Sequence, residues 1–173
     1  MKLFCNACGK PNSSLLKGYM GMVCANCHQT NMEPAMLTSG AQTMGGHGAG
    51  VMFYCEPKQS VLLLKRSNLG DGEGTWCPPG GGVENDETIQ EAAQRECREE
   101  IGFDPREFTS VLHHMHRVYN PETHYTFHNH YAIVPYEFEP KLNEEHTDAK
   151  WFTTFSENLH PGFKKAVTSF YGA

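Results

Sequence analysis

The segment from Gly81 to Phe103, GGVENDETIQEAAQRECREEIGF, constrains the fold of this chain more than any other. Three of its glutamates, Glu96, Glu99 and Glu100, stand at positions i, i+3 and i+4. On an α-helix this spacing brings the three carboxylates to one side. Like charges at these spacings repel each other. We therefore expect a compensating positive charge, and the natural candidate is a bound cation.

The residues around these glutamates predict a helix over 86–100 that Asn85 or Asp86 caps. Ile89, Ala93 and Cys97 recur every four residues and predict an inward-facing apolar stripe. The helix would then present only carboxylate oxygens as ligands, a set that selects Mg²⁺ or Mn²⁺. These ions bind phosphates. The preceding glycines let the backbone come close, so the Gly81 carbonyl is a further candidate ligand.

The rest of the second half of the chain alternates strand-like and helical patterns. Five apolar runs predict strands, and a final helix has a proline near its start and a glycine beyond its end. This order predicts an α/β or α+β fold with a mixed sheet flanked by helices. Cys55, Cys77 and Cys97 are interpreted as small buried residues. The predicted strands are 51–57, 59–67, 108–120, 124–138 and 149–155, and the final helix is 161–172.

Four cysteines near the N-terminus form two C-x2-C pairs. The pairs are separated by 15 residues, Gly9 to Val23, a spacing that predicts a tetrahedral structural zinc site. Disulfides or free thiols are the alternatives, and His28 is either a substitute ligand or a surface residue. We expect a zinc ribbon over 1–38, a linker within 37–50, and a second domain over 39–173. The four cysteines are Cys5, Cys8, Cys24 and Cys27.

The composition limits the partners of the chain. The formal net charge is −6, which argues against bulk attraction to nucleic acid or to anionic lipid. No apolar run reaches the length of a membrane span, and the N-terminus lacks the pattern of a signal peptide. We therefore expect a cytoplasmic protein whose cysteines remain reduced. A small molecule that carries phosphates is compatible with this charge if cations assist its binding.

The whole acidic segment fits the pattern G-x5-E-x7-R-E-U-x-E-E-x-G-U, in which U is apolar. Gly81 opens the pattern, Glu87 follows, and RECREEIGF closes it from Arg95 to Phe103. This string resembles the Nudix hydrolase box at every fixed position, with Cys97 at the aliphatic one. The resemblance implies an α/β/α sandwich, and a homodimer is common among such proteins. It also implies hydrolysis of the pyrophosphate linkage in a nucleoside diphosphate joined to another group.

The resemblance also implies roles for individual residues. Glu96, Glu99 and Glu100 would bind the metal ions together with the Gly81 carbonyl. Glu87 and Arg95 would be the pair that ties the loop to the helix. Glu99 or a glutamate outside the box would be the general base. In LNEEHTDAKW the outside candidates are Glu144 and Glu145, and Glu145 is preferred.

The substrate stays open at this level. A zinc ribbon before a Nudix domain resembles the NADH pyrophosphatase arrangement, but the string SQPWPFP is absent from this sequence. Tyr119 lies at a spacing from the box that resembles diadenosine polyphosphate hydrolases. The candidates are ADP-ribose, NAD(H)-like dinucleotides and diadenosine polyphosphates. The alternatives are a hydrolase of damaged nucleoside triphosphates, a non-catalytic nucleotide sensor, and a hydrolase that the ribbon delivers to capped RNA.

Histidines are concentrated in the hairpin predicted around Pro121. Alternation would place His114 and His116 on one face of the first strand, and His128 and His130 on one face of the second. Such a set could form a second metal site or a wall of the substrate pocket. It could equally be a row of polar positions on a half-exposed hairpin.

Overall fold

The structure is a computed structural model, and it describes residues 46–108, 112–155 and 158–171. The predicted zinc ribbon, with Cys5, Cys8, Cys24, Cys27 and His28, lies outside the described residues. The fold below is therefore that of the second predicted domain.

One mixed sheet organises this part of the chain. Its strands follow the order β3-β2-β1-β6-β5, while β4 also pairs with β1 and β7 with β2. The pairing of β1 with β6 is parallel, and the other pairings are antiparallel. The strands are β1 (His47–Cys55), β2 (Ser60–Arg66), β3 (Trp76–Cys77), β4 (Gly80–Gly82), β5 (His113–Asn120), β6 (Tyr125–Val134) and β7 (His146–Phe152).

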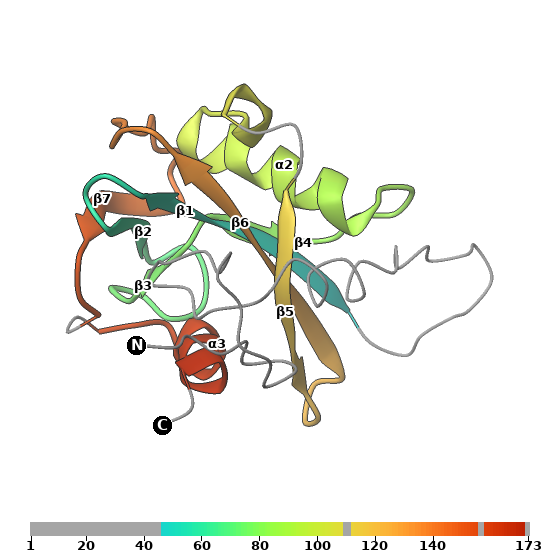
Figure 1. Cartoon of the computed structure of the whole chain (residues 1–173). Coiled ribbons are helices and arrows are strands. Elements are labelled where there is room, and N and C mark those ends of the chain that lie inside the picture. Colours follow the sequence, from blue (N-terminus) through green and yellow to red (C-terminus); the bar gives the residue numbers. More distant parts are fainter. Residues whose placement is uncertain (1–45, 109–111, 156–157, 172–173) are drawn as a thin grey trace, which may run out of the picture.

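Two helices pack on opposite faces of this sheet, as Figure 1 shows. Strand β1 is buried on both faces because its side chains alternate. Val51 and Phe53 belong to the core beneath α2 (Ile89–Ile101), whereas Met52 and Tyr54 belong to the core beneath α3 (Pro161–Tyr171). The predicted mixed sheet flanked by helices is thus confirmed. Neither helix of the described residues is long and apolar enough to cross a membrane.

The predicted linker 37–50 is wrong at its C-terminal end. His47 to Gly50 already belong to β1, and Gly48 and Gly50 are buried there. A side chain at Gly50 would come within 2.7 Å of the Pro79 carbonyl oxygen. These glycines therefore allow a close approach between strands, although their composition resembles that of a linker.

The acidic helix is capped at both ends. Its N-cap is Thr88, not Asn85 or Asp86, because Thr88 and Glu91 form a reciprocal capping box. At the C-terminus, Gly102 takes a left-handed conformation with φ of 65°, which favours glycine. Ile89, Ala93 and Cys97 are buried in the core, as the predicted stripe requires.

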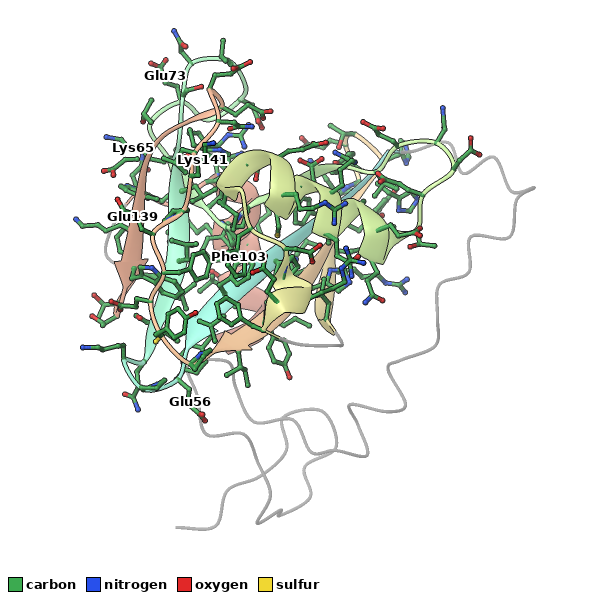
Figure 2. The ribbon with its side chains drawn as sticks, turned by 90° about the horizontal axis from the view of Figure 1, so that it is seen from above. Glu56, Lys65, Glu73, Phe103, Glu139 and Lys141 are labelled. Carbon is green, nitrogen blue, oxygen red and sulfur yellow. The ribbon has the colours of Figure 1, made fainter. Side chains whose placement is uncertain are left out.

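The segment after β6 returns to the C-terminal end of α2. The Lys141 N–H donates to the Ile101 carbonyl oxygen at 2.9 Å, and the Asn143 N–H donates to the Glu100 carbonyl oxygen at 3.3 Å. Figure 2 shows Lys141 beside this end of the helix. Strand β7 then starts at His146, three residues earlier than predicted. The loop that carries Glu144 and Glu145 is thereby held against the acidic helix.

The predicted hairpin of β5 and β6 is confirmed. The prediction that alternation places His114 and His116 on one face of β5 does not hold, because a register shift between them pairs His114 with His130 and His116 with Asn129. Such a shift interrupts the regular alternation on which that prediction depended. His128 and His130 are buried rather than half-exposed.

Candidate active site

Arg95 is the centre of a network of carboxylates beside β4. Its guanidinium donates two hydrogen bonds to Glu87, at 3.1 Å from Nε and 2.8 Å from Nη2. Nη2 also donates to the Gly82 carbonyl oxygen at 2.8 Å. The predicted contact between Glu87 and Arg95 is therefore present. It joins the start of α2 to the glycine strand, because Glu87 also accepts from the Glu84 N–H at 2.7 Å.

The same arginine gathers two of the three glutamates on the helix. Nη1 of Arg95 lies 2.9 Å from Glu96 Oε1 and 2.9 Å from Glu99 Oε2. These two oxygens therefore converge on one nitrogen atom. Arg95 thus supplies part of the positive charge that the three glutamates require. Its hydrogen bonds to Glu87, Glu96 and Glu99 raise its own pKa, with Glu87 contributing most. Glu99 remains 54% exposed, so its carboxylate is open to a ligand.

Glu100 occupies a different environment from Glu99. Its side chain is only 2% exposed, and its Oε2 accepts from the Gly80 N–H at 2.7 Å. The pKa of Glu100 is raised to about 8, first by burial and then by the negative charges of Glu96 and Glu145, although the hydrogen bond from the Gly80 N–H opposes the shift. Burial also raises the pKa of Glu96, although hydrogen bonding to Arg95 opposes the shift. A cation would stabilise the ionised forms of both carboxylates.

Gly81 lies directly against Glu96. A Cβ atom at this position would be 2.6 Å from Glu96 Oε1, far inside a normal contact. Gly81 pairs with Ala49 across β4 and β1, which fixes its backbone in the sheet. The absence of a side chain at Gly81 therefore leaves room for the Glu96 carboxylate, and the approach of this backbone to a metal or phosphate stays a prediction.

Glu145 is exposed and lies in the turn before β7. Its carbonyl oxygen accepts from the Ser67 N–H at 2.8 Å, and its own N–H donates to Asn143 Oδ1 at 3.1 Å. Its charge contributes to the raised pKa values of Glu96 and Glu100. Tertiary packing thus brings this glutamate near the helix carboxylates, from which about 45 residues separate it in the sequence.

The sequence analysis missed two residues of this region, His146 and Arg66. The side chain of His146 is 1% exposed, and its Nε2 lies 3.9 Å from Glu100 Oε1. Burial lowers the pKa of His146 to about 4, with a further contribution from the charge of Arg66. Arg66 pairs with His146 across β2 and β7, and its charge opposes the raised pKa of Glu100. The only sequence signal was a histidine directly after a candidate base.

Arg66 and α3 also hold the loop between β2 and β3. Arg66 donates to the Asp71 carbonyl oxygen at 2.6 Å and forms an ion pair with its carboxylate at 3.0 Å. His160, just before α3, lies 3.2 Å from the other Asp71 oxygen. Because the His160 Nδ1 accepts from the Gly162 N–H, its Nε2 carries the hydrogen. The loop is therefore fixed at both sides.

The oxygen atoms of the three helix glutamates suit a hard divalent cation, although their side chains are not grouped around a common point. Within residues 46–108, 112–155 and 158–171, no group of three or more His, Cys, Asp or Glu side chains is placed to hold a metal ion. Arg95 instead bridges Glu96 and Glu99. The candidate ligands Glu96, Glu99, Glu100 and the Gly81 carbonyl all offer oxygen atoms, and Glu96 and Glu100 have raised pKa values. This chemistry suits Mg²⁺ or Mn²⁺ rather than Zn²⁺.

Comparison with known proteins found a matching family model and several similar proteins. A family model described as the NUDIX domain matches residues 46–166. The CTP pyrophosphohydrolase of Escherichia coli K12 is 35% identical over 96 residues, which are 49% of this chain and 71% of that protein. The "Putative 8-oxo-dGTP diphosphatase 3" of Mycobacterium tuberculosis H37Rv is 30% identical over 139 residues, 72% of this chain and 62% of that protein. A MutT NUDIX hydrolase from Burkholderia pseudomallei has the same fold, with a TM-score of 0.59, 23% identity, and coverage of 71% of this chain and 95% of that chain.

Proposed function

This chain belongs to the Nudix family of hydrolases, and we propose that it hydrolyses the pyrophosphate linkage of a nucleotide at the Glu96–Glu99–Glu100 site. The observation that carries the proposal is the network of Arg95, which joins Glu87, Glu96 and Glu99 to the glycine strand. A network of this kind holds carboxylates in place before a ligand arrives. Nudix hydrolases use Mg²⁺ or Mn²⁺.

In this proposal Glu96, Glu99 and Glu100 hold the divalent cations, together with the Gly81 carbonyl. When bound, the cations neutralise the negative charge of the phosphates. Arg95 and Glu87 are positioning residues, because they fix the loop and the helix relative to each other. Glu145 takes the proton from the attacking water. Glu145 is suited to this role because it is exposed and near both buried carboxylates.

The substrate class proposed first is a nucleoside diphosphate joined to another group, such as ADP-ribose, an NAD(H)-like dinucleotide or a diadenosine polyphosphate. Tyr119, whose spacing from the box suggested the last of these, is 54% exposed and therefore accessible to a ligand. A nucleoside triphosphate, normal or oxidised, is the second candidate. The observation that favours it is the similarity to the CTP pyrophosphohydrolase of E. coli.

The test is release of phosphate or pyrophosphate from a panel of nucleotides with excess Mg²⁺ or Mn²⁺. The panel contains ADP-ribose, NADH, diadenosine polyphosphates, CTP and oxidised dGTP, and diphosphate-linked substrates are read after phosphatase treatment. We expect metal-dependent turnover that falls about 100-fold or more in Glu99→Gln. The fold should persist, because Glu99 is exposed and, within the described part of the chain, its side chain forms a hydrogen bond only with Arg95. Normal turnover in this variant would contradict the assignment.

The N-terminal cysteines form a second part of the proposal. Cys5, Cys8, Cys24 and Cys27 bind one structural Zn²⁺ in a ribbon over residues 1–38, and the hydrolase domain follows from residue 39. The support is the C-x2-C spacing, which suits a tetrahedral site. A segment of this length buries too little apolar surface to fold alone, so the metal would supply much of its stability.

A further inference from the structure

His146 is the residue beside the acidic site whose environment needs an explanation. Its Nδ1 is the one buried side-chain nitrogen or oxygen of the described residues without a hydrogen-bond partner. Buried polar atoms are nearly always paired, and each exception calls for a structural or catalytic reason. The side chain is 1% exposed, so bulk water does not compensate for the missing bond. The unpaired Nδ1 therefore lowers the free energy of unfolding, and this cost calls for a compensating role of the side chain.

The other nitrogen faces a carboxylate. Nε2 of His146 lies 3.9 Å from Glu100 Oε1, which is too long for a hydrogen bond but leaves the two groups adjacent. The second Glu100 oxygen is already fixed by the Gly80 N–H at 2.7 Å. Glu100 therefore lies between a backbone donor on one side and His146 on the other.

The unpaired Nδ1 indicates which nitrogen carries the hydrogen. A neutral imidazole has one N–H donor and one bare acceptor nitrogen. A hydrogen on Nδ1 would leave a buried donor unpaired, whereas a hydrogen on Nε2 would belong to the nitrogen that is 3.9 Å from Glu100 Oε1. The second tautomer is the less costly one, and it makes His146 a donor toward the carboxylate.

The position of His146 in the fold favours the same role. It is the first residue of β7, it directly follows Glu145, and it pairs with Arg66 where the register of β2 and β7 shifts. The Ser67 N–H holds the Glu145 carbonyl oxygen, and the Asn143 N–H holds that of Glu100. His146 thus lies where the base-carrying loop meets the ligand-carrying helix.

We propose that His146 is a positioning residue that supports the Glu100 carboxylate as a cation ligand by donating from Nε2. The inference rests on the proposed function, because it assumes that Glu100 binds a divalent cation. Outer hydrogen-bond partners of this kind orient a ligand, and their loss typically weakens metal affinity about 10- to 100-fold.

Three variants of the full chain separate donation from packing. His146→Gln keeps an amide N–H near the position of Nε2, His146→Asn places its amide near Nδ1, and His146→Phe keeps a ring without a donor. Binding of Mn²⁺ without nucleotide is measured by electron paramagnetic resonance of the free ion, and kcat and KM are measured in parallel. His128→Gln is the comparison variant, since His128 is also buried in the sheet and its Nε2 lies 3.2 Å from His47 Nδ1.

We expect His146→Phe and His146→Asn to weaken Mn²⁺ binding about 10-fold or more, while His146→Gln and His128→Gln stay within about threefold. Equal losses in the Asn and Gln variants would reduce His146 to a packing residue and overturn the proposal. Unchanged binding in the Phe variant would do the same. If the unmodified chain turns over nucleotides and all the His146 variants bind Mn²⁺ as tightly as the unmodified chain, only this inference fails. If the unmodified chain neither binds Mn²⁺ nor turns over any nucleotide, the proposed function fails with it.

A measurement on the unmodified chain does not depend on how the variants fold. Nitrogen-15 chemical shifts of a histidine distinguish a protonated from a bare ring nitrogen. With saturating Mg²⁺, which holds Glu100 in its ionised form, we expect the hydrogen of His146 on Nε2, and His146→Gln identifies its signal by removing it. A hydrogen on Nδ1 would overturn the proposal, because Nε2 could not then donate to Glu100.

Discussion

Arg95 holds three carboxylates and one carbonyl through a single guanidinium. The planar group offers five N–H donors in a fixed arrangement, so it contacts Glu87, Glu96 and Glu99 at the same time. A lysine at this position would offer a single ammonium group and could not span these partners. At the scale of single residues, the N–H groups of Arg95 thus compensate the negative charge of the helix glutamates. Glu99 nevertheless stays accessible to a ligand.

Glu145 and Glu144 provide a direct comparison for the general base. Both are exposed and adjacent, but the charge of Glu145 acts on Glu96 and on Glu100. We expect Glu145→Gln to lower kcat about 100-fold or more, because proton abstraction contributes roughly that factor. Glu144→Gln should retain kcat within about twofold by the same argument. Equal losses in the two variants, measured with saturating substrate, would remove the basis for choosing Glu145.

Gly81 and Gly82 offer a second matched pair. A Cβ at Gly81 would lie 2.6 Å from Glu96 Oε1, whereas a Cβ at Gly82 would meet nothing within 4 Å. Gly81→Ala should displace the Glu96 carboxylate and lower kcat about 10- to 100-fold, since displacements near 1 Å carry costs of this size. The kcat of Gly82→Ala should be close to that of the unmodified chain. Steady-state kinetics of the two variants would contradict the argument if Gly81→Ala retained full turnover.

At the scale of elements, α2 is a platform that is fixed at both ends. The capping box of Thr88 and Glu91 starts it, and Gly102 ends it. The short helix η1 (Pro105–Glu107) follows at once and is tied back to α2 by Asp104. Asp104 forms ion pairs with Arg98 of α2 and with Arg106 of η1, at 3.0 and 2.6 Å. The carboxylates of the helix are therefore carried by an element that resists fraying.

The Asp104 cluster predicts a pH dependence of stability. Hydrogen bonds from Arg106, Arg98 and the Arg106 backbone hold the pKa of Asp104 well below its usual range. A depressed pKa in the folded state means that the contribution is complete above the unfolded pKa of about 4, and is lost as the pH falls below it. Asp104→Asn should therefore lower the urea midpoint at pH 7, and the difference should shrink between about pH 4 and pH 2. A difference that is constant across this range would show that the charge of Asp104 does not stabilise the fold.

At the scale of the whole molecule, the site lies where three chain segments meet. The glycine strand β4, the helix α2 and the loop before β7 each contribute, and they are joined by Gly80–Glu100, Arg95–Gly82 and Asn143–Glu100 hydrogen bonds. Strand β1 pairs with β4 and contributes side chains to both cores. Figure 1 shows this strand between α2 and α3. Disturbing any one segment should therefore affect the geometry of the whole site.

The proposed zinc ribbon makes a prediction at this scale. Cys24→Ser or removal of Zn²⁺ should increase amide hydrogen exchange within residues 1–38, because the metal would supply most of the stability of that segment. The Arg95 network contains no cysteine, so turnover should change far less than exchange does. A zinc content well below one ion per chain, or unchanged exchange in Cys24→Ser, would contradict the ribbon.

Sequence spacing alone determined the local parts of this protein. The positions of Glu96, Glu99 and Glu100 on one helix and its buried stripe follow from helical periodicity. The Glu87–Arg95 pair was instead implied by the resemblance to the Nudix box. The hairpin and the mixed sheet were also predicted, because strand patterns and turn residues act locally. Thr88 was missed as the N-cap because several nearby polar residues could serve equally well in the sequence.

Only the tertiary structure decided which distant residues join the site. The parallel pairing of β1 with β6 places the glycines at residues 48 and 50 in a strand, although their composition resembles a linker. The contact of His146 with Glu100 and the register shift at His116 depend on how strands pair across long stretches of chain. Periodicity fixes the direction of a side chain within its own element, whereas its partner is set by packing and by backbone hydrogen bonding between elements. For this reason the acidic helix could be found in the sequence, and the histidine beside it could not.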